Sequence, residues 1–414
     1  MRILGKNLQI ESGRVDNVNT LLIGAPGTGK TRSYVLPNLM SAQEESLVVL
    51  DPKGEICDMT AAMMREKGYR VRQLDFVDPQ RSEVRYNPLA YCRTEEEILK
   101  FTALLVSDQK TRSSDIFWSQ TGQMLCNALV ALLKRHRPEN LQHLGSMVRL
   151  LRAATVQEDD VDRHVSKLDA AFKEVAEQDP KSWAYAQYEM VKRAAGKTQK
   201  SIIISLCAEF GGLMTPQMIE MMSRNDLDIP SLCCDKTVLY VKCSDVDRSK
   251  DKLVEIFFMQ LFQELYRLAD CDPSHTLPRP MHILLDDVGA NLRIPNMDGI
   301  IATARGRGIS LSLVLQSIGQ LKRQYTDYTS ILNSCNTVVF LGGSDIETCR
   351  EMAERLDRPL ADVLYKAPQV IYVFRQGSKP IITEVYDLKS HPDYPSIHEC
   401  RCAAGAQPKE EMYL

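Results

Sequence analysis

The sequence lacks several features that would place it at once in a specialised class of protein. No apolar run approaches the roughly 18 to 20 residues that a membrane helix needs, and residues 1–13 lack the apolar core of a signal peptide. No low-complexity tract or short repeat is visible. We therefore expect the chain as given to be soluble, with any membrane anchor lying outside it.

An excess of charge of one sign is also missing. The formal net charge is −3, which excludes a uniformly basic protein that coats nucleic acid and leaves room for a local basic channel. The 12 cysteines follow no framework of regular spacings. Such cysteine usage suits a reducing cytosol.

The α/β pattern is split along the chain. The composition, with 44% hydrophobic and 25% charged residues over 414 positions, indicates a globular protein with two or three domains, or one domain with an insertion. A strand at 21–23, a Gly-rich loop, a helix and a strand ending at Asp51 predict a parallel sheet covered by helices. Further strands are expected at 237–243, 281–287, 309–317, 336–343 and 369–376, with a helix at 252–268.

Between these parts, apolar residues recur at helical spacing, and we interpret the β-branched run at 201–205 as part of a helix. The predicted organisation has four segments. They are a first part of a nucleotide-binding domain (1–93), an all-helical inserted domain (94–222), the second part of the nucleotide-binding domain (223–388) and a loose C-terminal tail (389–414).

The segment GAPGTGKT at residues 24–31 matches G-x-x-x-x-G-K-[ST], between a strand and a helix as that motif requires. Backbone N–H groups of such a loop wrap a phosphate, Lys30 reaches the β- and γ-phosphates, and the Thr31 hydroxyl faces Mg²⁺. A Gly-rich turn without function is the alternative. The predicted ligands are ATP and Mg²⁺, and the predicted nucleotide-binding residues are Gly24, Ala25, Pro26, Gly27, Thr28, Gly29, Lys30, Thr31 and Arg32.

Two carboxylates end the strand at 281–287. Asp286 is expected to hold Mg²⁺ through a water and Asp287 to orient the attacking water, a task usually given to Glu. Asp is shorter by about 1.5 Å, and an error of about 1 Å can cost roughly a hundredfold in rate. Asp287 is thus expected to slow hydrolysis without abolishing it, unless the pair merely solvates a strand end.

Two further polar positions flank the strand at 309–317. Gln316 at its end suits a sensor of the γ-phosphate, beside the Gly-rich loop. Arg305 and Arg307 precede it in a Gly-rich bend, where a guanidinium could reach a phosphate on a neighbouring subunit. A surface arginine is the alternative for Arg305.

The motifs together resemble the conjugative coupling proteins of type IV secretion systems, the TraG/TraD group, over residues 18–386. The segments that carry the resemblance are IGAPGTGKT, VVLDPKGEI, YNPL, FW, FFMQLFQELYRLAD, ILLDDVGANLRIP, IATARGRGISLSLVLQSIGQLKRQY and VVFLGG. The resemblance implies a RecA-like P-loop NTPase fold with a mainly parallel sheet and an all-α inserted domain. It also implies an ATP-hydrolysing, DNA-translocating motor related to FtsK-type translocases.

The implied partners are relaxase-bound single-stranded DNA with the relaxosome proteins, components of the type IV secretion channel, and five further copies in a homo-hexamer. The implied location is the cytosolic face of the bacterial cell membrane, reached through an N-terminal anchor that this chain does not contain. Carried over to this sequence, Lys30 and Thr31 bind phosphate and Mg²⁺ and Asp286 is the metal-side carboxylate. Arg305 becomes the finger acting in trans, and Gln316 the sensor.

The resemblance has one departure near the site and leaves two other segments open. Asp286-Asp287-Val288 stands where the family usually has Asp-Glu-Phe. The helical domain is implied to be the receptor for substrates, and its basic run at 192–200 is either a contact for DNA or an acidic partner, or a solvated helix face. His398, Cys400 and Cys402 lack the paired spacing of a structural zinc site, and we predict no metal there.

Three functions remain open on the sequence. The leading hypothesis is an Mg²⁺-dependent ATPase that pumps relaxase-bound single-stranded DNA. The second is a docking receptor for secreted proteins, switched by nucleotide with little turnover, which the Asp287 departure favours. The third is a soluble FtsK-like translocase of double-stranded DNA, which the long helical insertion disfavours.

Overall fold

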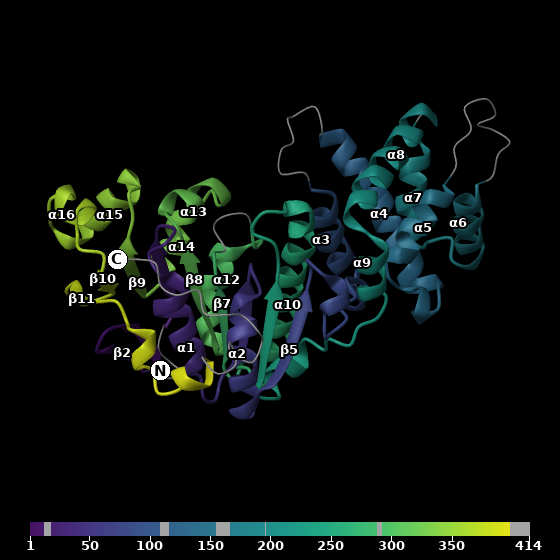
Figure 1. Ribbon diagram of the computed structural model, residues 1–414. Coiled ribbons are helices and arrows are strands. Elements are labelled where there is room, and N and C mark those ends of the chain that lie inside the picture. The colour runs from purple at the N-terminus through teal and green to yellow at the C-terminus, as the bar shows by residue number, and fades with distance from the viewer. Residues whose placement is uncertain (12–17, 108–115, 155–165, 195, 288–291, 398–414) are drawn as a thin grey trace. The chain divides into compact units, whose positions relative to one another are not determined.

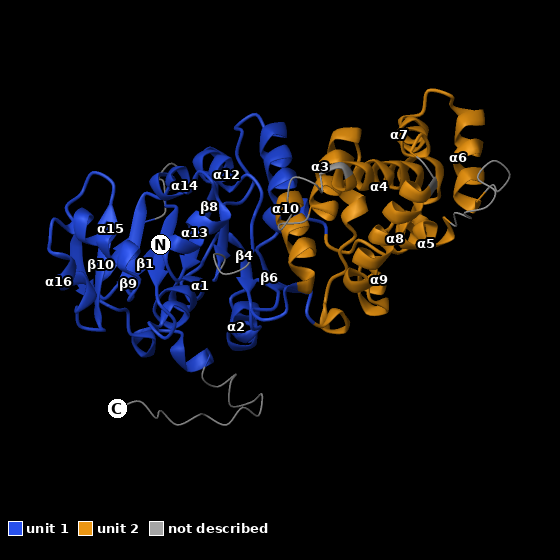
Figure 2. Ribbon diagram, turned by 90° about the horizontal axis from the view of Figure 1, so that it is seen from above, with its two compact units in different colours: residues 1–77, 228–248, 261–414 blue, residues 78–227, 249–260 orange. Residues whose placement is uncertain are grey.

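The fold is described from a computed structural model, which covers residues 1–11, 18–107, 116–154, 166–194, 196–287 and 292–397. Contacts divide the chain into two units (Figure 2). The first comprises residues 1–77, 228–248 and 261–414, and the second comprises 78–227 and 249–260. The boundaries at 93/94 and 222/223 remain a prediction about the domains.

A nine-stranded sheet forms the first unit, in the order β11-β10-β9-β3-β8-β7-β4-β6-β5 (Figure 1). The strands are β3 (Thr20–Gly24), β4 (Ser46–Asp51), β5 (Arg70–Asp75), β6 (Thr237–Lys242), β7 (Met281–Leu285), β8 (Ile309–Leu315), β9 (Thr337–Gly342), β10 (Val370–Arg375) and β11 (Ile381–Glu384). The strands from β9 to β5 pair in parallel, whereas β10 runs antiparallel to both of its neighbours. The predicted parallel α/β fold is confirmed.

The expected strands are present, and four others are additional. Strand β5 has the sequence RVRQLD, and its first four residues are exposed or half-buried, because it forms the edge of the sheet. The strand was not predicted because its charged residues interrupt any apolar run. A separate hairpin of β1 (Arg2–Gly5) and β2 (Leu8–Ile10), and the short edge strand β11, were also not expected.

Helices cover both faces of the sheet, as Figure 2 shows for α12 and α14 on one side and α1 and α2 on the other. The helical elements of this unit are η1 (Thr31–Val35, a π-helix), α1 (Leu36–Met40), α2 (Glu55–Glu66), α12 (Met297–Thr303), α13 (Ile318–Gln324), α14 (Tyr328–Ser334), α15 (Ile346–Leu356) and α16 (Leu360–Leu364). One buried cluster joins Leu22, Leu284 and Val314 of the sheet to Leu39 of α1 and Met63 of α2. This face of the sheet is thus buried under α1 and α2.

The second unit is helical. Its helices are α3 (Glu95–Val106), α4 (Ile116–His136), α5 (Leu144–Ala153), α6 (Lys167–Gln178), α7 (Trp183–Lys192), α8 (Gly196–Leu213) and α9 (Pro216–Met221). Capping boxes begin α3 at Thr94 and α6 at Ser166, and each satisfies backbone N–H groups of the first turn. The run at 201–205 lies in α8, as predicted. Helix α10 (Asp251–Cys271) contributes residues to both units.

Short 3₁₀ turns connect many of these elements. They are η2 (Pro79–Arg81), η3 (Pro88–Tyr91), η5 (Glu139–Leu141), η6 (Pro230–Cys233), η7 (Arg248–Lys250), η8 (Ala304–Arg307) and η9 (Leu388–Ser390). Leu388 and Ile397 are buried in the core cluster of the first unit, and the loose tail at 389–414 remains a prediction. Residues 398–414, with His398, Cys400 and Cys402, lie outside the described residues.

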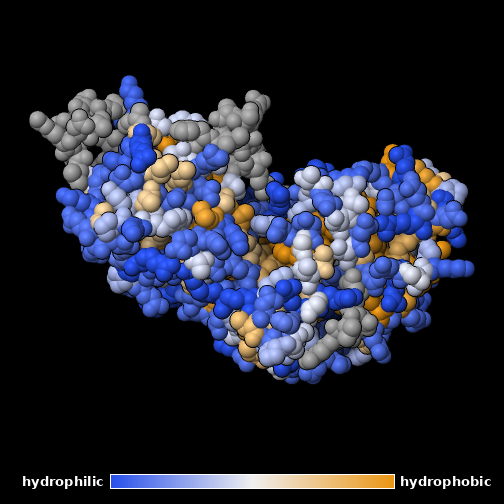
Figure 3. Space-filling model, turned by 180° about the vertical axis from the view of Figure 1, so that it is seen from behind, coloured by the Kyte–Doolittle hydropathy of each residue, from blue (hydrophilic) through white to orange (hydrophobic). Residues whose placement is uncertain are grey.

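The surface is mixed in polarity. The face drawn in Figure 3 is mainly hydrophilic, with hydrophobic residues in smaller groups. No helix among the described residues is long and apolar enough to cross a membrane.

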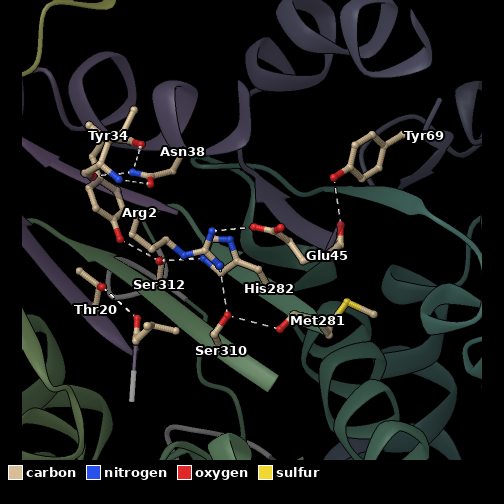
Figure 4. A network of polar contacts seen from close by, with 12 residues as sticks. Arg2, Thr20, Tyr34, Asn38, Glu45, Tyr69, Met281, His282, Ser310 and Ser312 are labelled. Carbon is tan, nitrogen blue, oxygen red and sulfur yellow. Dashed lines mark hydrogen bonds and ion pairs between the residues drawn. The ribbon is translucent and has the colours of Figure 1, made fainter. Parts of the chain in front are cut away.

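A buried polar network ties the N-terminal strand β1 to the sheet (Figure 4). Arg2 donates to the Glu45 carboxylate at 3.0 Å and to the Ser310 hydroxyl at 3.2 Å. His282 of β7 and Tyr34 of η1 each share a hydrogen bond of 2.9 Å with the Ser312 hydroxyl of β8. The network gives hydrogen-bond partners to several buried polar groups, while the Arg2 Nε and His282 Nδ1 atoms have none among the described residues.

Burial, and then the nearby Arg2 guanidinium, lower the pKa of His282 well below its ordinary value, so the folded protein keeps this ring neutral. The unfolded chain binds a proton at His282 below pH of about 6.5. We therefore expect the free energy of unfolding to fall by about 1.4 kcal/mol per pH unit below that value from this residue. In His282→Asn, denaturant titrations from pH 7 to 5 should give a shallower dependence.

The matched control is His275→Asn, because His275 is exposed and its φ of 53° suits Asn. This variant should retain the slope of the parent chain. An unchanged slope in His282→Asn would contradict the assignment.

Candidate nucleotide-binding site

The Gly-rich loop follows β3 directly and turns over the carboxyl edge of the sheet. Gly27 and Gly29 both have φ of +81°, a conformation that favours glycine. The loop is tied to the neighbouring strand end by the Ala25 N–H, which donates to the Gly342 carbonyl at 2.9 Å. The Ser33 N–H donates to the Gly29 carbonyl at 2.8 Å, which starts the helix. The loop backbone is thus held in a wrapped form suited to binding phosphate.

Lys30 lies within this loop. Its ammonium donates to the Gly24 carbonyl at 2.9 Å. Burial lowers the pKa of Lys30, while the carboxylates of Asp287 and Asp286 act in the opposite direction. The ammonium therefore lies in the field of the predicted acidic pair.

Asp286 meets Thr31 across 255 residues of sequence. The Thr31 hydroxyl donates to the Asp286 carboxylate at 3.0 Å. The carboxylate is buried, with 6% of the residue exposed, and burial raises its pKa to about 6. The structure thus brings together the two side chains predicted to serve Mg²⁺.

These oxygen donors fit Mg²⁺, which prefers carboxylate, hydroxyl, phosphate and water ligands and keeps several waters in nucleotide sites. A site made wholly of protein ligands is not seen, since the described residues contain no cluster of three or more His, Cys, Asp or Glu side chains able to hold a metal. The donor set therefore matches a metal completed by phosphate and water.

Asp287 and Gln316 also contact each other. The Gln316 side-chain amide donates to both carboxylate oxygens of Asp287, each at 3.0 Å. Strands β7 and β8 are neighbours, so residues just past their ends meet. Asp287 has φ of 53°, a left-handed conformation that Asp and Asn adopt more readily than most residues. The left-handed backbone therefore favours Asp at position 287.

A cavity of about 480 Å³ contains these groups. It is lined by Pro26, Gly27, Gly29, Lys30, Thr31, Arg32, Asp51, Pro52, Lys53, Glu55, Ile56, Asp245, Asp286, Asp287 and Gln316. All of them belong to the first unit. The lining carries five carboxylates and three cationic side chains, so it favours a nucleotide that arrives with a divalent cation.

Sequence reasoning missed Asp51, Lys53, Glu55 and Asp245. Asp51 ends β4, which pairs with β7 so that Leu50 lies opposite Leu285 and Asp51 follows next to Asp286. Its carboxylate accepts from the backbone N–H groups of Gly54 at 2.9 Å and Cys57 at 2.8 Å, and burial raises its pKa to about 6. The segment DPKGE follows a buried strand in the sequence. The order of the strands in the sheet was needed to place it at the cavity.

Arg305 lies away from this cavity. It precedes β8, whereas Gln316 follows β8, so the length of the strand, about 20 Å, separates the two positions. Arg305 is exposed, and Arg307 pairs with Asp270 at 2.9 Å and lies over the Tyr266 ring. A role for Arg305 at its own chain's cavity is not compatible with this placement, and its predicted role in trans stays a prediction.

The basic run of the helical unit is partly neutralised. Lys192 forms an ion pair with Asp169 at 3.0 Å. Lys197 and Lys200 lie in α8. These contacts do not decide between a surface that binds DNA or an acidic partner and a solvated helix face. Both interpretations of the run therefore remain predictions.

Comparison with known proteins places this site in a family context. A family model described as "Type IV secretory system Conjugative DNA transfer" matches residues 4–358. The conjugal transfer protein TraG of Escherichia coli is 25% identical over 346 residues, which cover 79% of this chain and 53% of TraG. Protein VirD4 of Rhizobium radiobacter is 22% identical over 369 residues, covering 86% of this chain and 49% of VirD4. The chain thus spans about half the length of the curated relatives it matches.

Solved structures of the plasmid coupling protein TrwB have a similar fold. TrwB in complex with ADP and Mg²⁺ gives a TM-score of 0.64 at 15% identity, covering 93% of both chains. TrwB in complex with sulphate gives a TM-score of 0.65 at 16% identity, covering 89% of this chain and 85% of TrwB. At this identity the likeness shows the fold.

The contact between Thr31 and Asp286 generates a test of the metal site. We expect Asp286→Asn to reduce, by about 10- to 100-fold, the factor by which Mg²⁺ raises the affinity for nucleotide. The substitution removes the negative charge on the metal side of the site. Binding of a fluorescent ADP analogue, measured with Mg²⁺ and with EDTA, gives this ratio.

The control is Asp362→Asn, which removes an exposed carboxylate of α16 that does not line the cavity. It should bind like the parent chain. A full Mg²⁺ effect in Asp286→Asn would show that Asp286 is not on the metal side.

Proposed function

Because this chain belongs to the type IV secretory system conjugative DNA transfer family, we propose that it is an Mg²⁺-dependent ATPase that drives DNA transfer. Hydrolysis would be coupled to the recruitment and translocation of relaxase-bound single-stranded DNA. The observation that carries the proposal is the cavity in which the P-loop, Asp286, Asp287 and Gln316 meet. The complexes of the relative TrwB with ADP and Mg²⁺ and with a non-hydrolysable ATP analogue support it.

The proposed chemistry follows from the side chains in the cavity. Gly24 to Arg32 would bind the phosphates, Thr31 and Asp286 would hold Mg²⁺, and the metal would neutralise charge on the reacting phosphates. Asp287 would orient the attacking water, and Gln316, which already contacts Asp287, would link that position to the state of the γ-phosphate. In this mechanism binding and positioning, rather than covalent catalysis, accelerate the reaction.

Arg305 would act on the site of a neighbouring copy. Its exposed position beyond the other end of β8 allows action in trans, which requires assembly, and we propose a ring of six. The helical segment at 94–222 is the proposed receptor for relaxosome proteins. The ring would work at the cytosolic face of the cell membrane and deliver its cargo to the secretion channel.

Lys30→Ala tests the motor. We expect ATP turnover to fall by at least about a hundredfold, because the ammonium stabilises charge on the transferred phosphate. Turnover should be measured under conditions that assemble oligomers, with single-stranded DNA and with double-stranded DNA at matched salt. Stimulation by single strands supports the proposed cargo, whereas stimulation by duplex alone would favour the FtsK-like translocase.

Normal DNA transfer by Lys30→Ala would overturn the motor assignment. The control is Lys379→Gln, in the exposed turn between β10 and β11, outside the cavity. It should transfer DNA at the parental rate.

A second function is favoured by one observation at Asp287. Both of its oxygens accept from Gln316, and its side chain is shorter than Glu, which suits a nucleotide-switched docking receptor with little turnover. Under the motor proposal, Asp287→Glu should not raise turnover, because the left-handed backbone at φ 53° already suits Asp. Steady-state ATPase assays measure this.

A gain above about tenfold in Asp287→Glu, about 1.4 kcal/mol of barrier, would instead show a restrained site and support the receptor. Asp287→Asn keeps the backbone preference and removes the charge, and it is the matched control. It should reduce turnover under both functions while ADP binding persists.

A further inference from the structure

We propose that Lys53 is a ligand of the terminal phosphate, supplied by the chain's own β4–α2 loop. The proposal rests on the proposed ATPase function and assigns a residue to which neither the P-loop motif nor the acidic strand end points. Lys53 lines the same cavity as Lys30, Asp286 and Asp287.

The strand order fixes the position of Lys53. The P-loop follows β3, Gln316 follows β8, the acidic pair follows β7, and Lys53 follows β4, which are four consecutive strands of the sheet. The cavity therefore runs along these strand ends, and Lys53 lies on the far side of the acidic pair from the P-loop. A nucleotide with its phosphates in the P-loop and Mg²⁺ at Thr31 and Asp286 would present its last phosphate towards this side.

The backbone of the loop is anchored at that place. The backbone N–H groups of Gly54 and Cys57 donate to the Asp51 carboxylate at 2.9 and 2.8 Å. Gly54 has φ of +77°, a left-handed conformation that favours glycine, and it follows Lys53 in this turn. The Asp51 carboxylate thus serves the loop, and the Lys53 side chain extends from a fixed base.

The charge of Lys53 is available for a ligand. Across the described part of the chain, its ammonium forms no hydrogen bond or ion pair, although five carboxylates line the cavity. The cavity that Lys53 lines also contains Lys30. A terminal phosphate would neutralise this side chain, and a divalent cation that arrives with it would offset the acidic pair, which lies between Lys53 and the P-loop in the strand order.

Lys53 also supplies what Arg305 cannot. In many P-loop NTPases a cation beyond the P-loop lysine and the metal stabilises charge on the reacting phosphates. Arg305 lies past the other end of β8, whereas Lys53 already lines the cavity in cis. A single copy of the chain would therefore distinguish ATP from ADP before any ring assembles.

The experiment compares a nucleotide that has the terminal phosphate with one that lacks it. Affinities of the purified chain for fluorescent ADP and for a fluorescent non-hydrolysable ATP analogue are measured with Mg²⁺, below the concentration of assembly. In Lys53→Gln we expect affinity for the ATP analogue to fall about tenfold, as for the loss of one charge-assisted hydrogen bond, with affinity for ADP unchanged. Lys53→Arg should restore most of the affinity for the ATP analogue.

The control is Lys379→Gln, which removes an exposed lysine outside the cavity and should leave both affinities unchanged. Unchanged affinity for the ATP analogue in Lys53→Gln, or an equal loss for both nucleotides, would overturn the assignment of Lys53 while leaving nucleotide binding intact. Failure of the parent chain to bind either nucleotide would instead overturn the proposed function.

Discussion

The parallel pairing of β3, β8, β7 and β4 is the constraint on which the site depends. Parallel strands end at the same edge of a sheet, so residues that follow them are neighbours however far apart they lie in sequence. Thr31 and Asp286, 255 positions apart, form a hydrogen bond of 3.0 Å for this reason. The buried residues of these strands, such as Leu22, Leu284 and Val314, thereby position polar groups that they never touch.

This arrangement has an electrostatic cost that a ligand would offset. Asp51 and Asp286 are both buried at adjacent strand ends, and burial raises the pKa of each to about 6. Keeping either of them ionised at neutral pH costs the fold on the order of 3 kcal/mol. This cost remains although Asp51 accepts from backbone N–H groups and Asp286 accepts from the Thr31 hydroxyl. A divalent cation beside Asp286 would stabilise the charged form directly, so in the proposed function metal binding and stability are coupled.

The sequence predicted the parts of this site that carry a local signature. Gly24 to Thr31 form a motif whose geometry is encoded within eight residues, and Asp286 ends an apolar run that reads as a buried strand. Gln316 was expected beside the Gly-rich loop, and its contact with Asp287 was not predicted. Asp51 and Lys53 were not predicted as site residues, because their position depends on the pairing of β4 with β7. These two strands are separated by more than 200 residues in the sequence. Strand β5 was not predicted, because a strand at the edge of a sheet can carry polar residues on an exposed face.

The proposed mechanism therefore uses two cations outside the P-loop, one from the chain that binds the nucleotide and one from a neighbouring copy. Lys53 lines the cavity of its own chain, and a contact with the terminal phosphate would depend only on nucleotide binding. Arg305 lies about a strand length from that edge, and its contribution would depend on a neighbouring copy. Recognition of ATP and acceleration of its hydrolysis would then have different requirements. A chain that binds ATP through Lys53 but waits for Arg305 of a neighbour would couple turnover to assembly, without any change in the P-loop itself.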